Sequence, residues 1–146
     1  ATVPGAVSGW AALSNKFGSL GFESLFEPAI RYANEGFLVS RQTAAGWARG
    51  AKRYAQFPVW QATFTSNGIP PQPGDCVKLP DHGATLAEIA TTQGESFYHG
   101  KLAHCMHEAS VNEGGMLRLD DLESHQCQWV EPIAVDCGYG KLHELP

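Results

Sequence analysis

The sequence predicts a mainly α-helical chain that ends in a β-hairpin. Apolar residues recur at spacings of three and four through most of residues 6–112, which is typical of amphipathic helices. Residues 133–145 instead alternate between apolar and polar side chains around a glycine-containing turn, which is typical of a hairpin. A chain of 146 residues is long enough to bury one core. We therefore expect a single segment, helical over residues 1–128 and a hairpin over residues 129–146.

Three helices are expected in the first third of the chain, each bounded by a turn or capping residue. Their expected ranges are Ala6–Phe17, a helix within Phe22–Gly36, and Ser40–Tyr54. Proline lacks a backbone N–H, so Pro28 is expected in the first turn of the second helix. That helix is therefore expected to start near Glu27.

The stretch Gln56–Gly83 has a different composition, with five prolines and three glycines. We expect an ordered loop with one short strand at Ala62–Thr65. A loop of this length in a compact domain usually has a functional or packing reason.

Two further helices are expected after this loop. Thr85 and Glu88 have capping-box spacing and predict a helix start, with the helix stopping at Gly94. The next helix is expected over Lys101–Asn112. Its predicted core stripe is Leu102, Cys105, Met106 and Ala109.

The last elements are shorter. A short helix is expected from Leu119, with Asp120 or its neighbour as N-cap. In the hairpin, Ile133, Val135 and Cys137 are expected on one face, and the turn at Gly138–Gly140.

Charge argues against nucleic acid as a partner. Residues 1–73 hold six basic and three acidic side chains, and residues 74–146 hold four and twelve, which gives a net charge of −5. Phosphate binding needs clustered cations. The one local basic cluster consists of Arg41, Arg49, Lys52 and Arg53. We interpret it as a solvated helix face, with a patch for an anionic ligand as the alternative.

No stretch approaches the ~18 to 20 apolar residues that a membrane-spanning helix needs, so no membrane partner is expected. The first residues have neither the basic nor the apolar region of a signal peptide. The four cysteines are Cys76, Cys105, Cys127 and Cys137. They form no C-x-x-C pair and are too sparse for a disulfide scaffold, so we expect buried free thiols, which favour a reducing, cytoplasmic compartment.

The first candidate for a chemical site is the group of His104, His107 and Glu108, which could suggest a metal site. The two histidines lie three residues apart on a helix, but the order is not the H-E-x-x-H arrangement. Both are expected opposite the core stripe, so a polar, solvent-facing surface is the preferred interpretation.

A second candidate is the carboxylate group of Asp120, Asp121 and Glu123, which could suggest acid–base chemistry. Acidic side chains at a helix start also satisfy free N–H groups and oppose the positive helix end. We favour this capping role.

Nucleophilic catalysis is not supported by the residues alone. Ser8, Ser14 and Ser24 fall inside expected helices without a G-x-S-x-G turn, and Cys127 has only sequence adjacency to His125. No dinucleotide motif is present. We assign no catalytic, cofactor-binding or metal-binding residue.

A series of short motifs nevertheless recurs in a recognisable order over essentially the whole chain. They are Val3-Pro4-Gly5, Phe26–Phe37, Pro80-Asp81-His82 with Thr85-Leu86, Ser96–Gly100, Gly114–Leu117 with Asp120–Leu122, Trp129–Ile133, and Leu145-Pro146. In this order and spacing the chain resembles the part of the γ-glutamyltransferase large subunit that precedes the catalytic threonine.

Two departures from the family pattern affect the expected chemistry. Pro80–Ala84 differs from the usual Pro-Asp-Leu-Ala and, with Trp129–Pro132 and the Val135-Asp136 strand, is similar to acylase-like and oxamate-amidohydrolase-like members. This argues against glutathione as the substrate. Cys137–Gly140 replaces an aromatic-Arg-Gly-Tyr turn, which is expected to alter the hairpin and not the chemistry.

The resemblance implies an N-terminal nucleophile hydrolase with an αββα sandwich. Such a precursor cleaves itself to expose a threonine, whose amine acts as the base for its own hydroxyl. The resemblance places that threonine after Pro146 and the substrate-binding arginine before Ala1. It implies no cofactor. The implied partners are the remaining large-subunit regions, the threonine-bearing subunit, and an amide or γ-glutamyl small molecule.

The leading hypothesis is therefore a non-catalytic segment of such an amidohydrolase or acyltransferase. The alternative is a self-standing helical interaction module without enzymatic activity. A third hypothesis is metal binding through His104 and His107.

Overall fold

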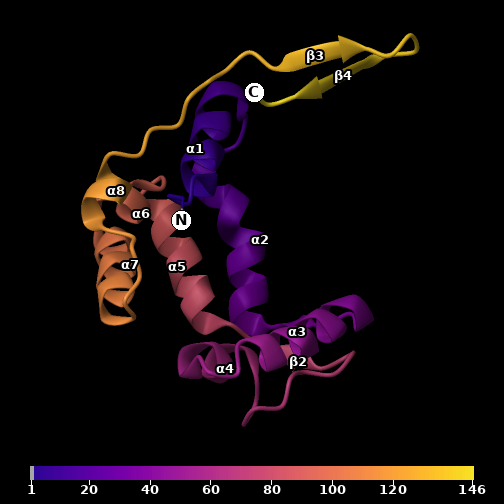
Figure 1. The fold of residues 1–146 in the computed structure, drawn as a ribbon, viewed down its shortest axis with the longest axis vertical. Helices are drawn as coiled ribbons and strands as arrows, with labels where there is room; N and C mark the ends of the chain where they lie inside the picture. Colours follow the sequence, from indigo (N-terminus) through magenta and orange to yellow (C-terminus); the bar gives the residue numbers. More distant parts are fainter. Residues whose placement is uncertain (1) are drawn as a thin grey trace.

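The computed structural model describes residues 2–146, which form helices and two small antiparallel sheets (Figure 1). In chain order the elements are α1 (Ala6–Phe17), α2 (Phe22–Glu35), β1 (Phe37–Leu38), α3 (Arg41–Arg53), α4 (Pro58–Phe64), β2 (Cys76–Val77), α5 (Pro80–Thr91), α6 (Glu95–His99), α7 (Lys101–Asn112), α8 (Leu119–Glu123), β3 (Ile133–Asp136) and β4 (Lys141–Glu144). The expected mainly helical chain with a C-terminal hairpin is confirmed.

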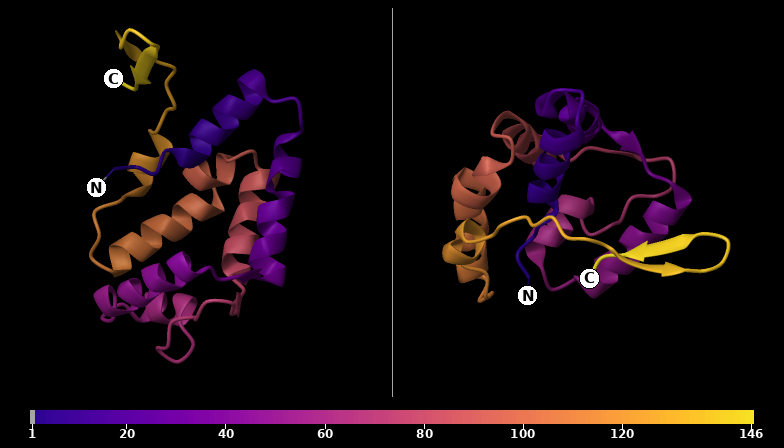
Figure 2. Two further views of the ribbon diagram at one scale, coloured as in Figure 1. Left: turned by 90° about the vertical axis from the view of Figure 1, so that its right-hand side faces the viewer. Right: turned by 90° about the horizontal axis from the view of Figure 1, so that it is seen from above.

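Two antiparallel helices, α2 and α5, form the centre of the helical part (Figures 1 and 2). The core cluster gathers side chains from α1, α2, α5 and α6: Val7, Phe26, Ile89, Ala90 and Tyr98. The short helices α6 and α8 and the longer α7 pack together beside α5. Helices α3 and α4 cross the end of the α2–α5 pair that lies far from α1.

The start of α2 differs from the expectation. The helix begins at Phe22, so Pro28 lies inside it and not in its first turn. Phe22, Phe26 and Ile30 recur every four residues and belong to the core or pack against it. Pro28 itself is exposed, and so is Ser24, whose carbonyl has no helical N–H partner because proline lacks that group. Core packing along one face therefore outweighs one missing hydrogen bond on the other.

The stretch Gln56–Gly83 is not the loop that its composition predicted. It holds α4, β2 and the first turn of α5 in place of a strand at Ala62–Thr65. Pro58 and Pro80 each open a helix, where their missing N–H is not needed. Aromatic contacts hold α4 on α3, since Trp47 lies 5.5 Å from Phe64 and Tyr54, at the end of α3, lies 5.5 Å from Trp60. The proline content predicted a loop because proline usually interrupts helices. The aromatic contacts that stabilise α4 depend on three-dimensional packing, which local sequence does not show.

Helix α5 begins five residues before Thr85, so the predicted capping box is wrong. The Thr85 hydroxyl instead donates to the Asp81 carbonyl at 2.9 Å. The early start brings α5 close to α2, since a Cβ at Gly83 would collide with the amide of Asn34. The helix ends at Thr91, and Gly94 then takes a left-handed conformation with φ 85°.

The bounds of α7 are as predicted, but its packed face is rotated. Cys105 and Ala109 are exposed, whereas Ala103 is buried and His107 is half-buried. In α8, Arg118 is the N-cap in place of Asp120. The predicted buried thiols are also wrong, because all four cysteines are free and exposed.

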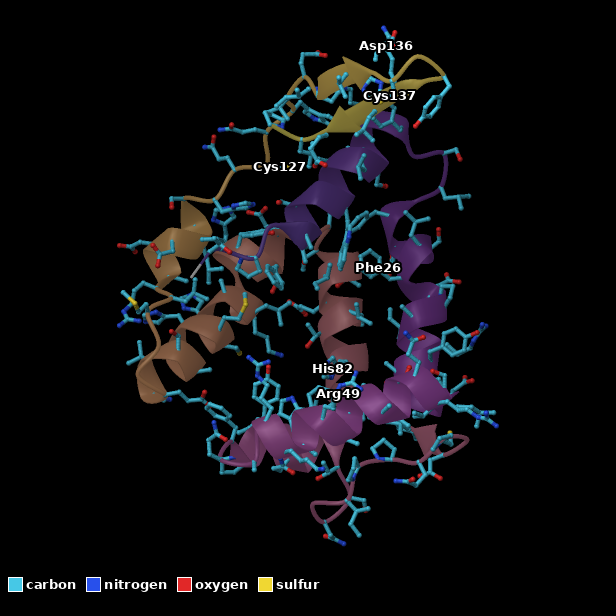
Figure 3. All side chains as sticks on the ribbon, turned by 45° about the vertical axis from the view of Figure 1, so that its right-hand side comes forward. Phe26, Arg49, His82, Cys127, Asp136 and Cys137 are labelled. Atoms are coloured by element: carbon cyan, nitrogen blue, oxygen red, sulfur yellow. The ribbon has the colours of Figure 1, made fainter. Side chains whose placement is uncertain are left out.

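The hairpin forms as predicted, with Val135 opposite Leu142 and a turn through Gly138. It projects past the C-terminal end of α1, with Asp136 and Cys137 at its far end (Figure 3). All eight strand residues are exposed.

Within residues 2–146 no helix combines the length and apolar character that crossing a bilayer requires.

Candidate functional site

The predicted metal candidates do not come together as a site. His104 and Glu108 are exposed on α7. His107 instead lies on the packed side, where its Nδ1 accepts a hydrogen bond from the backbone N–H of Leu119 at 3.2 Å. The expectation that both histidines face away from the core is therefore wrong for His107, which fixes the start of α8. Across residues 2–146 no group of three His, Cys, Asp or Glu side chains is arranged to hold a metal ion.

The acidic residues at α8 act as expected for a helix start. Asp121 accepts a hydrogen bond from the backbone N–H of Arg118 at 2.8 Å through Oδ2. Asp120 and Glu123 are exposed beside it. This geometry agrees with the capping interpretation.

A polar junction that no sequence pattern predicted lies between α1, α6 and the segment after α8. The Tyr98 hydroxyl donates to the Pro4 carbonyl at 2.8 Å and accepts from the Ser8 N–H at 3.1 Å. Ser8 Oγ lies 2.8 Å from His125 Nε2, and the His125 ring stacks on Tyr98 with 4.9 Å between centroids. Ser8 and His125 are 117 residues apart, so no sequence signal pointed to this contact.

We interpret the Ser8–His125 pair as structural. Ser8 Oγ also donates to the Gly5 carbonyl at 2.9 Å, so the hydroxyl proton points away from the imidazole. The ring then donates to Ser8, which is the reverse of the role of a general base. In the part of the chain that the structure describes, no carboxylate is hydrogen-bonded to His125 to orient it.

The other candidate nucleophiles are also placed without a base. The Ser24 hydroxyl donates to the Gly21 carbonyl at 2.8 Å. Cys127 lies on the extended segment between α8 and the hairpin and is exposed (Figure 3). The basic residues Arg41, Arg49, Lys52 and Arg53 are all exposed on α3, as expected for a solvated face.

An uncovered apolar hollow lies between the first two helices. We call it the α1–α2 groove, a hollow of about 530 Å³. Trp10, Leu13 and Phe17 of α1 are more than 45% exposed there. The groove is lined by Trp10, Leu13, Ser14, Phe17, Gly18, Phe22, Leu25, Phe26, Ala29 and Leu86.

A second uncovered apolar surface is the hairpin, which is linked to the groove. Ile133, Val135 and Leu142 are 56–64% exposed. Trp129, just before β3, meets Phe17 edge-to-face at 5.7 Å, and Lys16 Nζ lies 3.9 Å from a Trp129 ring centroid. The end of the groove is therefore tied to the base of the hairpin. These surfaces, and not a catalytic cluster, are the candidate functional feature of residues 2–146.

Comparisons with known proteins show which family and which relatives this chain is similar to. The family profile described as gamma-glutamyltranspeptidase matches residues 1–146. A glutathione hydrolase-like proenzyme of Bacillus subtilis is 30% identical over 99% of this chain and 28% of its own length. An acylase proenzyme of a Pseudomonas species is 32% identical over 90% of this chain and 24% of its own length.

Solved structures share the fold. The crystal structure of a cephalosporin acylase from Bacillus halodurans superposes with a TM-score of 0.94 at 36% identity, over 99% of this chain and 28% of that one. A gamma-glutamyltranspeptidase from Helicobacter pylori superposes with a TM-score of 0.93 at 26% identity, over 99% and 42% of the two chains. The chain thus spans about a quarter of the length of the curated relatives it matches. On the family match over its whole length, the chain belongs to the gamma-glutamyltranspeptidase family.

Proposed function

We propose that residues 1–146 form a single, non-catalytic segment of the large subunit of a γ-glutamyltransferase-like amidohydrolase or acyltransferase. The nucleophile of that enzyme is an N-terminal threonine outside these residues, exposed when a precursor cleaves itself. Membership of the family and relatives named as proenzymes support this proposal.

The uncovered hairpin is the observation that carries the proposal. A two-stranded hairpin is only marginally stable in water, and both strands here are exposed throughout. Its free edges and apolar side chains suit continuation into a larger sheet. In the proposed enzyme that sheet is part of an αββα sandwich, and helices of this segment form part of an outer layer.

The proposed chemistry takes place outside the segment. The amine of the threonine accepts the proton of its own hydroxyl, and the oxygen attacks an amide carbonyl. The C–N bond breaks, the amine leaves with a proton, and the acyl-enzyme passes its acyl group to water or to another amine. Hydrogen-bond donors stabilise the oxyanion. The substrate class is an amide, either γ-glutamyl or another acyl amide, since relatives of both kinds match.

Production of the complete natural polypeptide tests this proposal. Intact mass and N-terminal sequencing should reveal a companion chain that begins with threonine. The processed protein should hydrolyse γ-glutamyl anilide or a simple acyl amide, and residues 1–146 alone should not.

Amide hydrolysis by residues 1–146 alone would overturn the non-catalytic role. A lone natural species of 15.7 kDa that ends at a natural stop codon would instead favour the self-standing interaction module.

A further inference from the structure

The α1–α2 groove has the spacing of a seat for a helix. On α1, Trp10, Leu13 and Phe17 follow the i, i+3, i+7 pattern, with Ser14 at i+4. On α2, Phe22, Leu25, Phe26 and Ala29 repeat the i, i+3, i+4, i+7 pattern. Two such stripes facing one hollow are the arrangement into which the apolar face of a third amphipathic helix packs.

Packing between the two stripes does not bury all of their apolar side chains. Trp10 reaches Phe26 edge-to-face at 6.0 Å, which closes the floor of the groove, and Phe22 lies 4.9 Å from Phe26. Leu13, Phe17 and Leu25 remain 53%, 68% and 47% exposed above that floor. The outer half of each stripe is therefore left for a further element.

We propose that the α1–α2 groove seats an amphipathic helix from the part of the same polypeptide that lies outside residues 1–146. This rests on the proposed function only in that it needs a longer polypeptide. The curated relatives carry roughly three quarters of their length outside the matched part, so material for such a helix is available.

Continuity with the hairpin favours this occupant over a second copy of the chain. The Phe17–Trp129 contact joins the end of the groove to the segment that leads into β3. The groove and the hairpin lie at the same end of the helical part. A body that continues the hairpin's sheet is thereby already beside the groove.

Photocrosslinking in the complete polypeptide tests this occupant. p-Benzoylphenylalanine in place of Leu13 should crosslink, within one polypeptide, to a region outside residues 1–146. The same probe in place of Asn15, which is exposed and about 200° further round α1, is the matched control and should not reach that region. Crosslinks from Leu13 between two copies, or to no site outside residues 1–146, would overturn the proposal.

A charge substitution gives an independent readout. Leu13→Asp should lower the melting temperature of the complete protein by on the order of 5 °C, because it would bury an unpaired carboxylate. Asn15→Asp adds the same charge and should shift it by only about 1 °C. Equal small shifts would mean that the groove is open to water. Neither measurement depends on self-cleavage or activity. The groove proposal can therefore be contradicted while the proposed function is supported, and the proposed function can be contradicted while the groove proposal is supported.

Discussion

The helical body (residues 2–123) and the hairpin (residues 133–144) are held by different means. In the helical body, Val7, Phe26, Ile89 and Tyr98 form one buried cluster from four helices. The hairpin has backbone pairing but no buried side chain. Apolar burial is the main source of folding stability. The body therefore carries its own stabilisation, whereas the hairpin depends on whatever covers it.

The largest difference should appear when a leucine is shortened in each region. Leu122 is fully buried, at 0% exposure, so Leu122→Ala should lower the free energy of unfolding by about 2–5 kcal/mol. Leu142 is exposed, so Leu142→Ala should change it by less than about 0.5 kcal/mol in the 146-residue chain. Urea unfolding followed by circular dichroism measures both. Equal losses for the two variants would contradict the contrast.

A matched pair of glycines separates packing from backbone conformation. Gly94 and Gly138 have nearly the same left-handed φ, 85° and 83°. A Cβ at Gly94 would lie 2.9 Å from Val7 Cγ1, whereas nothing lies within 4 Å at Gly138. Gly94→Ala should therefore cost about 1–3 kcal/mol of global stability.

Gly138→Ala should cost about 1 kcal/mol, confined to the hairpin. Global unfolding of both variants in urea, with hairpin chemical shifts for the second, checks the pair. A larger global loss at Gly138 would show that the hairpin stabilises the helical body.

Two tyrosines provide a smaller contrast. Tyr98 is buried and its hydroxyl bonds both Pro4 and Ser8, so Tyr98→Phe should cost about 1 kcal/mol of unfolding free energy. Tyr139 at the hairpin turn is 96% exposed, so Tyr139→Phe should leave stability unchanged. Thermal unfolding monitored by fluorescence compares them. No loss on Tyr98→Phe would mean that water replaces the hydroxyl at the junction.

The smallest expected effect concerns the link between the two regions. Lys16 lies over Trp129, so Lys16→Ala should cost about 0.5–1 kcal/mol at most. We expect the Trp129 ring to become more accessible to solvent, which would increase the quenching of its fluorescence by acrylamide. With three other tryptophans present, the readout needs the variant Trp129→Phe as the reference. Unchanged quenching would show that the cation–π contact does not help to hold the segment that contains Trp129.

Local patterns predicted much of the fold, because helix periodicity and capping residues act over a few positions. The helices α1, α3 and α7 and the hairpin turn follow from such patterns. The start of α2 and the helix α4 were missed, because both depend on packing partners distant in sequence. Pro28 is tolerated where its face is exposed, and α4 is held by aromatic contacts to α3.

The candidate site was less predictable than the fold. Apolar spacing predicted that α1 and α2 are amphipathic helices, but it could not show that Leu13, Phe17 and Leu25 stay exposed. The Ser8–His125 contact forms because the segment after α8 lies against α1. His107 takes its packed position because the start of α8 lies against α7. Both contacts join residues that are distant in sequence. Motif order, in contrast, gave the family directly.

Hydrogen exchange at the hairpin tests the central claim most directly. Amide exchange of residues 133–144 would be compared between the 146-residue chain and the complete protein. We expect strong protection only in the complete protein, because there the strand edges and apolar faces are covered. Equal, rapid exchange in both would contradict the account, since the hairpin would then be a free appendage and not part of a larger sheet.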